Sequence, residues 1–195
     1  MTEPAESIEL TDPRALRAIA HPLRMRLIGL LRLEGPLTAT RAGQLLGESS
    51  GSCSFHLRQL AKYGMVEEAG GGQGREKPWR ATAMSTSWPA IPDTPEATAA
   101  AQLFSTVVAD RYLELIRTWI AVSPDEPDEW REAAAIGDSI IYATPDELAE
   151  LMRRMVALVE PYSERVTRRE TRPPGARPIS VLHVAVPNDR RHTDA

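Results

Sequence analysis

Two short helix-forming segments joined by a single glycine constrain the fold of this chain more than any other feature. Thr38 can cap a helix that ends at Leu46, and Gly47 permits a tight turn directly after it. Ser49 or Ser50 can then cap a second helix that runs to about residue 63, where Gly64 follows as the usual terminating residue. The sequence therefore predicts two helices packed at an angle across a tight turn.

The second of these helices has one apolar face and one polar face. Cys53, Leu57 and Leu60 are spaced at i, i+4 and i+7, so they form the inward face. Small or polar residues, with one aromatic, are left on the outer arc or its flanks: Ser50, Gly51, Ser52, Ser54, Phe55, Arg58, Gln59 and Lys62. Small residues at the start of a helix allow close approach to a DNA groove, and the hydroxyls and free N–H groups there can meet phosphates. Arg58 and Gln59 carry donors and acceptors suited to base edges.

The surrounding residues, 12–82, are expected to form one compact unit. Asp12 and His21, each followed by proline, predict the starts of two further helices. In the second of these, leucines and Ile28 form the buried face, and Arg24, Arg26 and Arg32 are expected to point away from it.

A glycine-rich hairpin closes the same unit. Residues 70–74 are predicted to be its tip, between a strand at 65–68 and a return strand at 78–82 that Trp79 anchors to the domain. Arg75 and Lys77 lie beside the tip, from which they can reach the neighbouring DNA backbone or the minor groove.

Charge is distributed unevenly along the chain. The net charge of the whole chain is −4, yet residues 13–82 carry 11 Lys/Arg against 5 Asp/Glu. The acidic excess lies in residues 1–12, with 4 acids and no base, and in residues 83–195, with 18 acids and 12 bases. A basic segment beside acidic ones indicates a polyanion-binding module joined to another unit, although a chance fluctuation would look the same.

The second half is predicted to be a different, α+β unit. We expect a loose tail at 1–11, a proline-containing linker at 83–95, a second domain at 96–187 and a frayed tail at 188–195. A long helix over 95–122 should open this domain, and a capping box at residues 144–147 should start an amphipathic helix to about residue 165. The apolar, β-branched runs 139–143 and 179–186 are expected to pair as a small two-stranded element.

Composition narrows the classes of function. The chain has one cysteine, its acidic N-terminal residues do not resemble a signal peptide, and no apolar run approaches the ~18 residues of a membrane span, so a cytoplasmic protein is expected. No nucleophile–base pair, phosphate loop or metal-ligand spacing is found, so we expect no enzyme activity, cofactor or bound metal. Cys53 lies on an apolar helix face, which favours a buried structural thiol over a redox sensor.

Four segments in order resemble the ArsR-type winged helix-turn-helix regulators of bacteria: residues 20–27 (AHPLRMRL), 42–47 (AGQLLG), 54–60 (SFHLRQL) and 63–67 (YGMVE). The resemblance covers about residues 12–82. It implies a dimeric repressor or activator whose second motif helix enters the major groove, with wing contacts from Arg75 and Lys77. By position it implies a DNA-facing set of Ser50, Ser52, Ser54, Phe55, His56 and Arg58. Residues 38–46 lack the metal-binding side chains of the metal-sensing members, which argues against a metal sensor.

Other residues are expected to support this function in three ways. His56 should either contact phosphate or make a local hydrogen bond. The long helix is the expected homodimer interface, through its apolar residues Leu103, Val107, Tyr112, Leu115 and Trp119. The acidic second domain is where a small-molecule or protein effector would bind. The sequence thus predicts a homodimeric regulator, with repression as the favoured role, that binds a palindromic operator in double-stranded DNA. The alternative is a winged domain used only for protein contacts.

Overall fold

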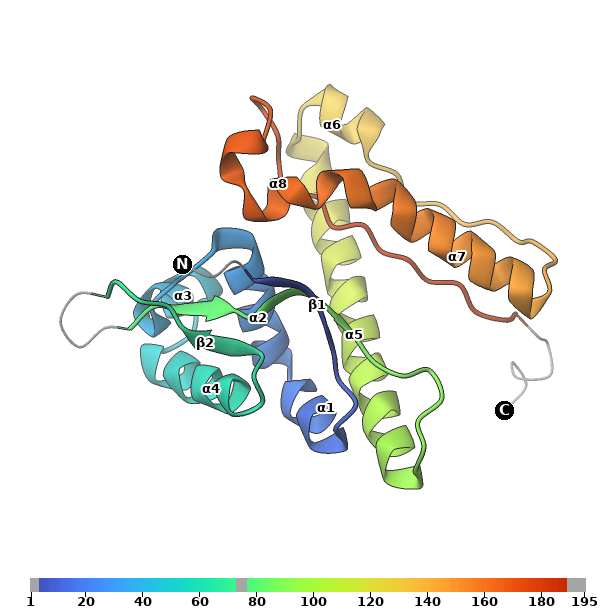
Figure 1. Ribbon diagram of the computed structural model, residues 1–195. Coiled ribbons are helices and arrows are strands. Elements are labelled where there is room, and N and C mark those ends of the chain that lie inside the picture. The colour runs from blue at the N-terminus through green and yellow to red at the C-terminus, as the bar shows by residue number, and fades with distance from the viewer. Residues whose placement is uncertain (1–3, 73–76, 189–195) are drawn as a thin grey trace. The chain divides into compact units, whose positions relative to one another are not determined.

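The computed structural model describes residues 4–72 and 77–188 (Figure 1). The chain divides into two units, residues 1–121 and 122–195, and each is described by itself. The first unit is an α+β winged helix-turn-helix domain, as the sequence predicts. None of the helices in the described ranges is long and apolar enough to cross a membrane.

The helices of the first unit begin at side-chain caps that the sequence specifies. Asp12, His21, Thr38 and Ser49 each accept a hydrogen bond from a backbone N–H in the first turn. These caps start α1 (Pro13–Ile19), α2 (Pro22–Glu34), α3 (Ala39–Leu46) and α4 (Ser50–Lys62). Leucines of α2 and α4 form the centre of the core, with Leu27, Leu57 and Leu60 completely buried.

The wing is a short antiparallel hairpin of β2 (Val66–Glu68) and β3 (Trp79–Ala81), with Val66 opposite Ala81. Leu37 forms an isolated antiparallel bridge with Trp79 just before α3, and the Trp79 side chain is buried in the core. The wing is thus tied to the helices on one side, as predicted for Trp79.

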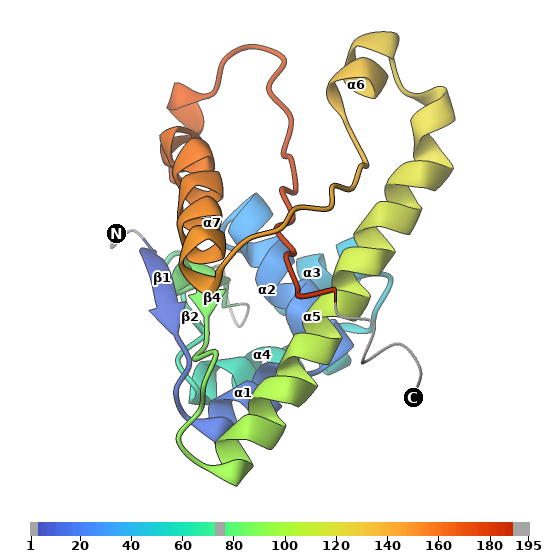
Figure 2. The same ribbon diagram turned by 90° about the vertical axis from the view of Figure 1, so that its right-hand side faces the viewer.

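A second, parallel strand pair lies where no strand was predicted. β1 (Ala5–Glu9) pairs with β4 (Ala83–Ser87), two strands that also lie side by side in Figure 2. The predicted loose tail at 1–11 and linker at 83–95 therefore both contain sheet residues. The guanidinium of Arg32 reinforces β4, because it donates to the Ala83 carbonyl over 2.9 Å and to the Thr86 hydroxyl over 2.7 Å.

α5 (Pro95–Val122) begins on the first unit, which differs from the predicted domain boundary. Ala100, Ala101 and Phe104 are buried in the core of the first unit. The Trp88 ring meets Phe104 edge-on at 4.6 Å, and the Trp88 indole N–H donates to the Ser105 hydroxyl over 3.2 Å. The first turns of α5 therefore pack on the winged helix-turn-helix core rather than on a separate domain.

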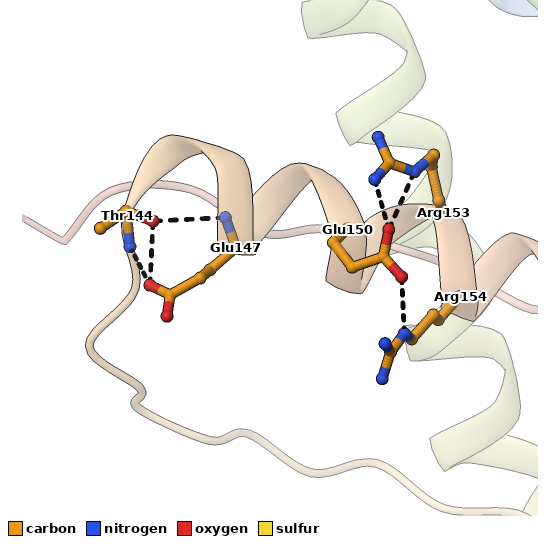
Figure 3. A network of polar contacts seen from close by, with 5 residues as sticks. All are labelled: Thr144, Glu147, Glu150, Arg153 and Arg154. Carbon is orange, nitrogen blue, oxygen red and sulfur yellow. Dashed lines mark hydrogen bonds and ion pairs between the residues drawn. The ribbon is translucent and has the colours of Figure 1, made fainter.

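The described residues of the second unit form α6 (Asp128–Ala133), α7 (Pro145–Val159) and α8 (Glu164–Thr167). They also form the single-turn 3₁₀ helices η1 (Ser123–Asp125), η2 (Glu160–Tyr162) and η3 (Arg169–Thr171). Thr144 and Glu147 form the predicted capping box at the start of α7, and Glu150 pairs with Arg153 and Arg154 on its polar side (Figure 3). The carboxylate of Glu126 binds the Arg177 guanidinium through two hydrogen bonds, of 2.7 and 2.9 Å.

The prediction of strands at 139–143 and 179–186 is wrong. Both segments are irregular and largely exposed, and the two-stranded sheets of the described chain lie before residue 88. β-branched residues favour strands only when a partner strand and a covering layer are present, and neither lies against these segments in the part of the chain described.

Candidate nucleic-acid interface

Backbone hydrogen bonds and the side chain of Arg26 hold the turn between α3 and α4. Gly47 adopts a left-handed conformation with φ of 69°, and the N–H groups of both Gly47 and Glu48 donate to the Gly43 carbonyl. Arg26, from α2, donates to the Leu46 carbonyl over 2.8 Å and pairs with the Glu48 carboxylate at 3.4 Å. The angle between α3 and α4 is therefore fixed by backbone hydrogen bonds and one arginine.

At Gly43, α3 lies very close to the backbone of the same turn. A Cβ atom at Gly43 would lie 2.7 Å from the Glu48 carbonyl oxygen and 3.3 Å from the Ser50 nitrogen. Both are backbone atoms, which cannot move aside without opening the turn. A residue without a side chain is thus required for α3 to lie this close to the start of α4.

The inward and outward faces of α4 are those expected from its sequence. Cys53, Leu57 and Leu60 are completely buried. Exposed residues repeat along the opposite face: Ser50, Gly51, Phe55, Arg58 and Lys62. The other residues predicted to contact DNA from this helix are half-buried on its flanks: Ser52, Ser54, His56 and Gln59.

Arg58 is oriented along the exposed face of α4. Its guanidinium donates to the Ser54 hydroxyl, one turn earlier, over 3.1 Å. This contact uses one donor of a side chain that has five, so the others can reach a base or phosphate. The aromatic ring of Phe55, half exposed at 50%, lies in the same stripe.

His56 turns away from this face and toward α2. Its ring lies 4.5 Å from the ring of His21, which itself caps α2 by accepting the Leu23 N–H over 3.2 Å. The Nδ1 atom of His56 and the Nε atom of Arg24 are buried and have no hydrogen-bond partner among the described residues. The structure therefore places His56 between α4 and α2 rather than on the exposed stripe.

The environment of the two histidines favours their neutral forms. Burial lowers the pKa of His56, and the neighbouring His21 and Arg24 lower it further. Burial and Arg24 likewise lower the pKa of His21. Glu48 acts in the opposite direction on the pKa of His56, but it is the smallest contribution.

The three arginines predicted to point away from α2 instead contact its neighbours. Arg24 faces the histidines, Arg26 holds the turn, and Arg32 binds β4. Burial, followed by repulsion from Arg111, lowers the pKa of Arg32 to about 10. Helical spacing separates apolar from polar positions, but it does not show that a long arginine bridges to the next element.

Of the two wing residues predicted to contact DNA, Lys77 lies within the described residues. The ammonium group of Lys77 pairs with the Glu68 carboxylate at 2.6 Å, and both side chains are largely exposed. An exposed ion pair of this kind contributes little to stability, so Lys77 can exchange Glu68 for a phosphate at small cost. Arg75, the other predicted wing contact, lies outside the described residues.

Comparison with known proteins agrees with this geometry. Residues 19–69 match a helix-turn-helix domain family. The match spans α2, α3, α4 and the first strand of the wing. None of the proteins of curated function matches the chain.

Several solved structures are similar to the chain. One is the homodimeric winged helix-turn-helix DNA-binding domain of Mb0332 from Mycobacterium bovis, a possible ArsR-family regulator, with 24% identity over 51% of this chain and 79% of that one and a TM-score of 0.33. Another is the transcriptional repressor BigR from Xylella fastidiosa, with 22% identity over 49% and 82% and a TM-score of 0.29. A third is ZitR from Lactococcus lactis in complex with DNA, with 15% identity over 70% and 73% and a TM-score of 0.28.

Proposed function

We propose that this protein is a transcriptional regulator of the ArsR type that binds double-stranded DNA through α4. The observation that carries the proposal is the division of α4 into a completely buried apolar face and an exposed stripe of small, aromatic and basic residues. A helix held rigidly by its neighbours and free along one polar side can lie in the major groove. The basic balance of residues 13–82 supplies the attraction to phosphate.

Each part of the surface has a distinct task in this proposal. Ser50, Gly51 and Ser52 bring the start of α4 close to the DNA backbone, where hydroxyls and N–H groups meet phosphates. Arg58 reads a base edge, for which guanine is the favoured partner of an arginine. Lys77 and Arg75 of the wing bind the neighbouring backbone, which adds affinity without sequence preference.

The regulator acts as a homodimer on a palindromic operator. One winged domain reads only a short half-site, and a two-fold dimer presents two recognition helices about one helical turn, ~34–36 Å, apart. We assign a contact between the copies to the apolar residues of α5: Leu103, Val107, Tyr112, Leu115 and Trp119. Leu103 is exposed and the other four are half-buried. Part of this apolar surface is therefore not covered by the chain itself and is available for a second copy. Repression follows when the dimer covers a promoter, and it needs no catalytic step.

Selection of bound sequences from random duplex DNA with the purified protein tests the proposal. We expect enrichment of an inverted repeat, and an affinity for it whose logarithm falls linearly with the logarithm of salt concentration. A winged domain used only for protein contacts would enrich no sequence and would show no such salt dependence.

A further inference from the structure

The second unit exposes most of its large apolar side chains. No described residue between 122 and 188 is buried, and Phe104 is the last buried residue in the described part of the chain. Val156, Leu158, Val184 and Val186 are each at least 60% exposed. An extended apolar surface of this kind marks a contact with another molecule.

The most apolar part is the segment 179–186, of sequence ISVLHVAV. It contains no Asp, Glu, Lys or Arg, it is rich in β-branched side chains, and it pairs with no strand in the described ranges. An unpaired segment of high β-propensity and low charge is a template for pairing with another chain.

The helix α7 contributes a second apolar surface. Ala149, Met152, Val156 and Ala157 line an open hollow along one side of the helix, and the charged residues Arg153 and Glu160 also line it. On its polar side, the capping box and the ion pairs of Glu150 stabilise the helix through contacts within its own turns (Figure 3). These local contacts can therefore keep α7 helical even when no partner covers its apolar side.

The charges of the second unit indicate which kind of molecule covers its exposed apolar surface. Residues 122–188 carry 12 Asp/Glu against 8 Lys/Arg, which disfavours nucleic acid and anionic lipid. In a two-fold contact each residue near the axis meets a copy of its own surroundings, so like charges there would repel. The segment 179–186 meets this requirement because it has no Asp, Glu, Lys or Arg; its one titratable side chain is His183.

We propose that a second copy of this chain covers the second unit. Residues 179–186 pair antiparallel with the same residues of the other copy, and the apolar side of α7 is buried in the same contact. This inference rests on the homodimer proposed above, and it adds a contact to the one assigned to α5. The second unit then completes its core only in the dimer.

A cysteine scan locates the two-fold axis. In a Cys53→Ser background, single cysteines at positions 179–186 are oxidised mildly and analysed for disulfide-linked dimers. Directly opposed residues of antiparallel strands have Cα atoms ~4.5–5.5 Å apart, within the ~7 Å that a disulfide permits. We expect cross-linking to peak at one or two positions, and Ala134→Cys and Ala135→Cys, at exposed sites in the same unit, to give none. Uniform or absent cross-linking along 179–186 would overturn the proposal.

Sedimentation of the full chain gives a second, independent test. Val184→Lys should weaken dimerisation at least tenfold, whereas Ala135→Lys, which adds the same charge at another exposed site, should not change it. A disulfide within one chain between Ile141→Cys and a cysteine in 179–186 would show the alternative intramolecular strand pair and overturn the proposal. Cross-linking needs no DNA, so a protein that cross-links as expected but selects no sequence would refute the proposed function and leave this interface standing.

Discussion

Gly43→Ala tests how the turn before α4 is built. Alanine is favoured over glycine inside a helix by ~1 kcal/mol, so without other effects the change would stabilise α3. The new Cβ atom would lie 2.7 Å from the Glu48 carbonyl oxygen, which belongs to the backbone of the turn. Overpacking of this kind costs about 1–3 kcal/mol, so after the helix gain we expect a net loss of up to about 2 kcal/mol in the free energy of unfolding.

Gly51→Ala is the matched control for this substitution. Gly51 lies in the first turn of α4, and the atom nearest to its Cβ position, the Ser49 hydroxyl oxygen, is 4.0 Å away. We expect this variant to gain up to ~1 kcal/mol. Urea unfolding followed by circular dichroism compares the free energies of unfolding of the two variants and the unmodified protein. If Gly43→Ala is as stable as Gly51→Ala, the close approach of α3 to the turn is not what requires glycine.

Three further predictions concern charge, pH and assembly. Lys77→Ala should weaken binding to all DNA sequences alike and lower the salt slope by about one unit, as measured by fluorescence anisotropy; an unchanged slope would remove Lys77 from the interface. Because the pKa values of His21 and His56 are lowered in the fold, unfolding takes up protons, so stability should fall as the pH drops below about 6.5. His56→Gln should reduce this fall in urea unfolding at about pH 5 compared with about pH 7.5, and an equal fall in both proteins would contradict the assignment. Leu115→Glu and Trp119→Glu should give a weaker dimer in analytical ultracentrifugation and lose tight operator binding, whereas normal assembly of both variants would place the dimer contact elsewhere.

Local features of the chain predict the first unit well. Each helix start from α1 to α4 carries its own cap, and the spacing of Cys53, Leu57 and Leu60 alone identifies the buried face of α4. These features depend on residues within a few positions of one another, so they can be read from the sequence without knowledge of the fold.

Features that depend on distant partners were not predictable in this way. β1 becomes a strand because Ala5 lies opposite Ala83, far along the chain, and neither segment has a strong strand pattern. Conversely, the β-branched residues 179–186 have the pattern but lack a partner in the described chain. The direction of Arg26 and the contact between His21 and His56 likewise depend on how α2 packs against α3 and α4.

The sequence preference of Arg58→Ala tests most directly whether α4 reads DNA. The variant and the unmodified protein are each used to select sequences from random duplexes, with Arg14→Ala, at an exposed position on α1, as the control. We predict that Arg58→Ala loses its preference at one position of each half-site and weakens operator binding by about 1–3 kcal/mol, while Arg14→Ala keeps the preference. An Arg58→Ala variant with unchanged affinity and unchanged preference would contradict the assignment of α4 as the recognition helix.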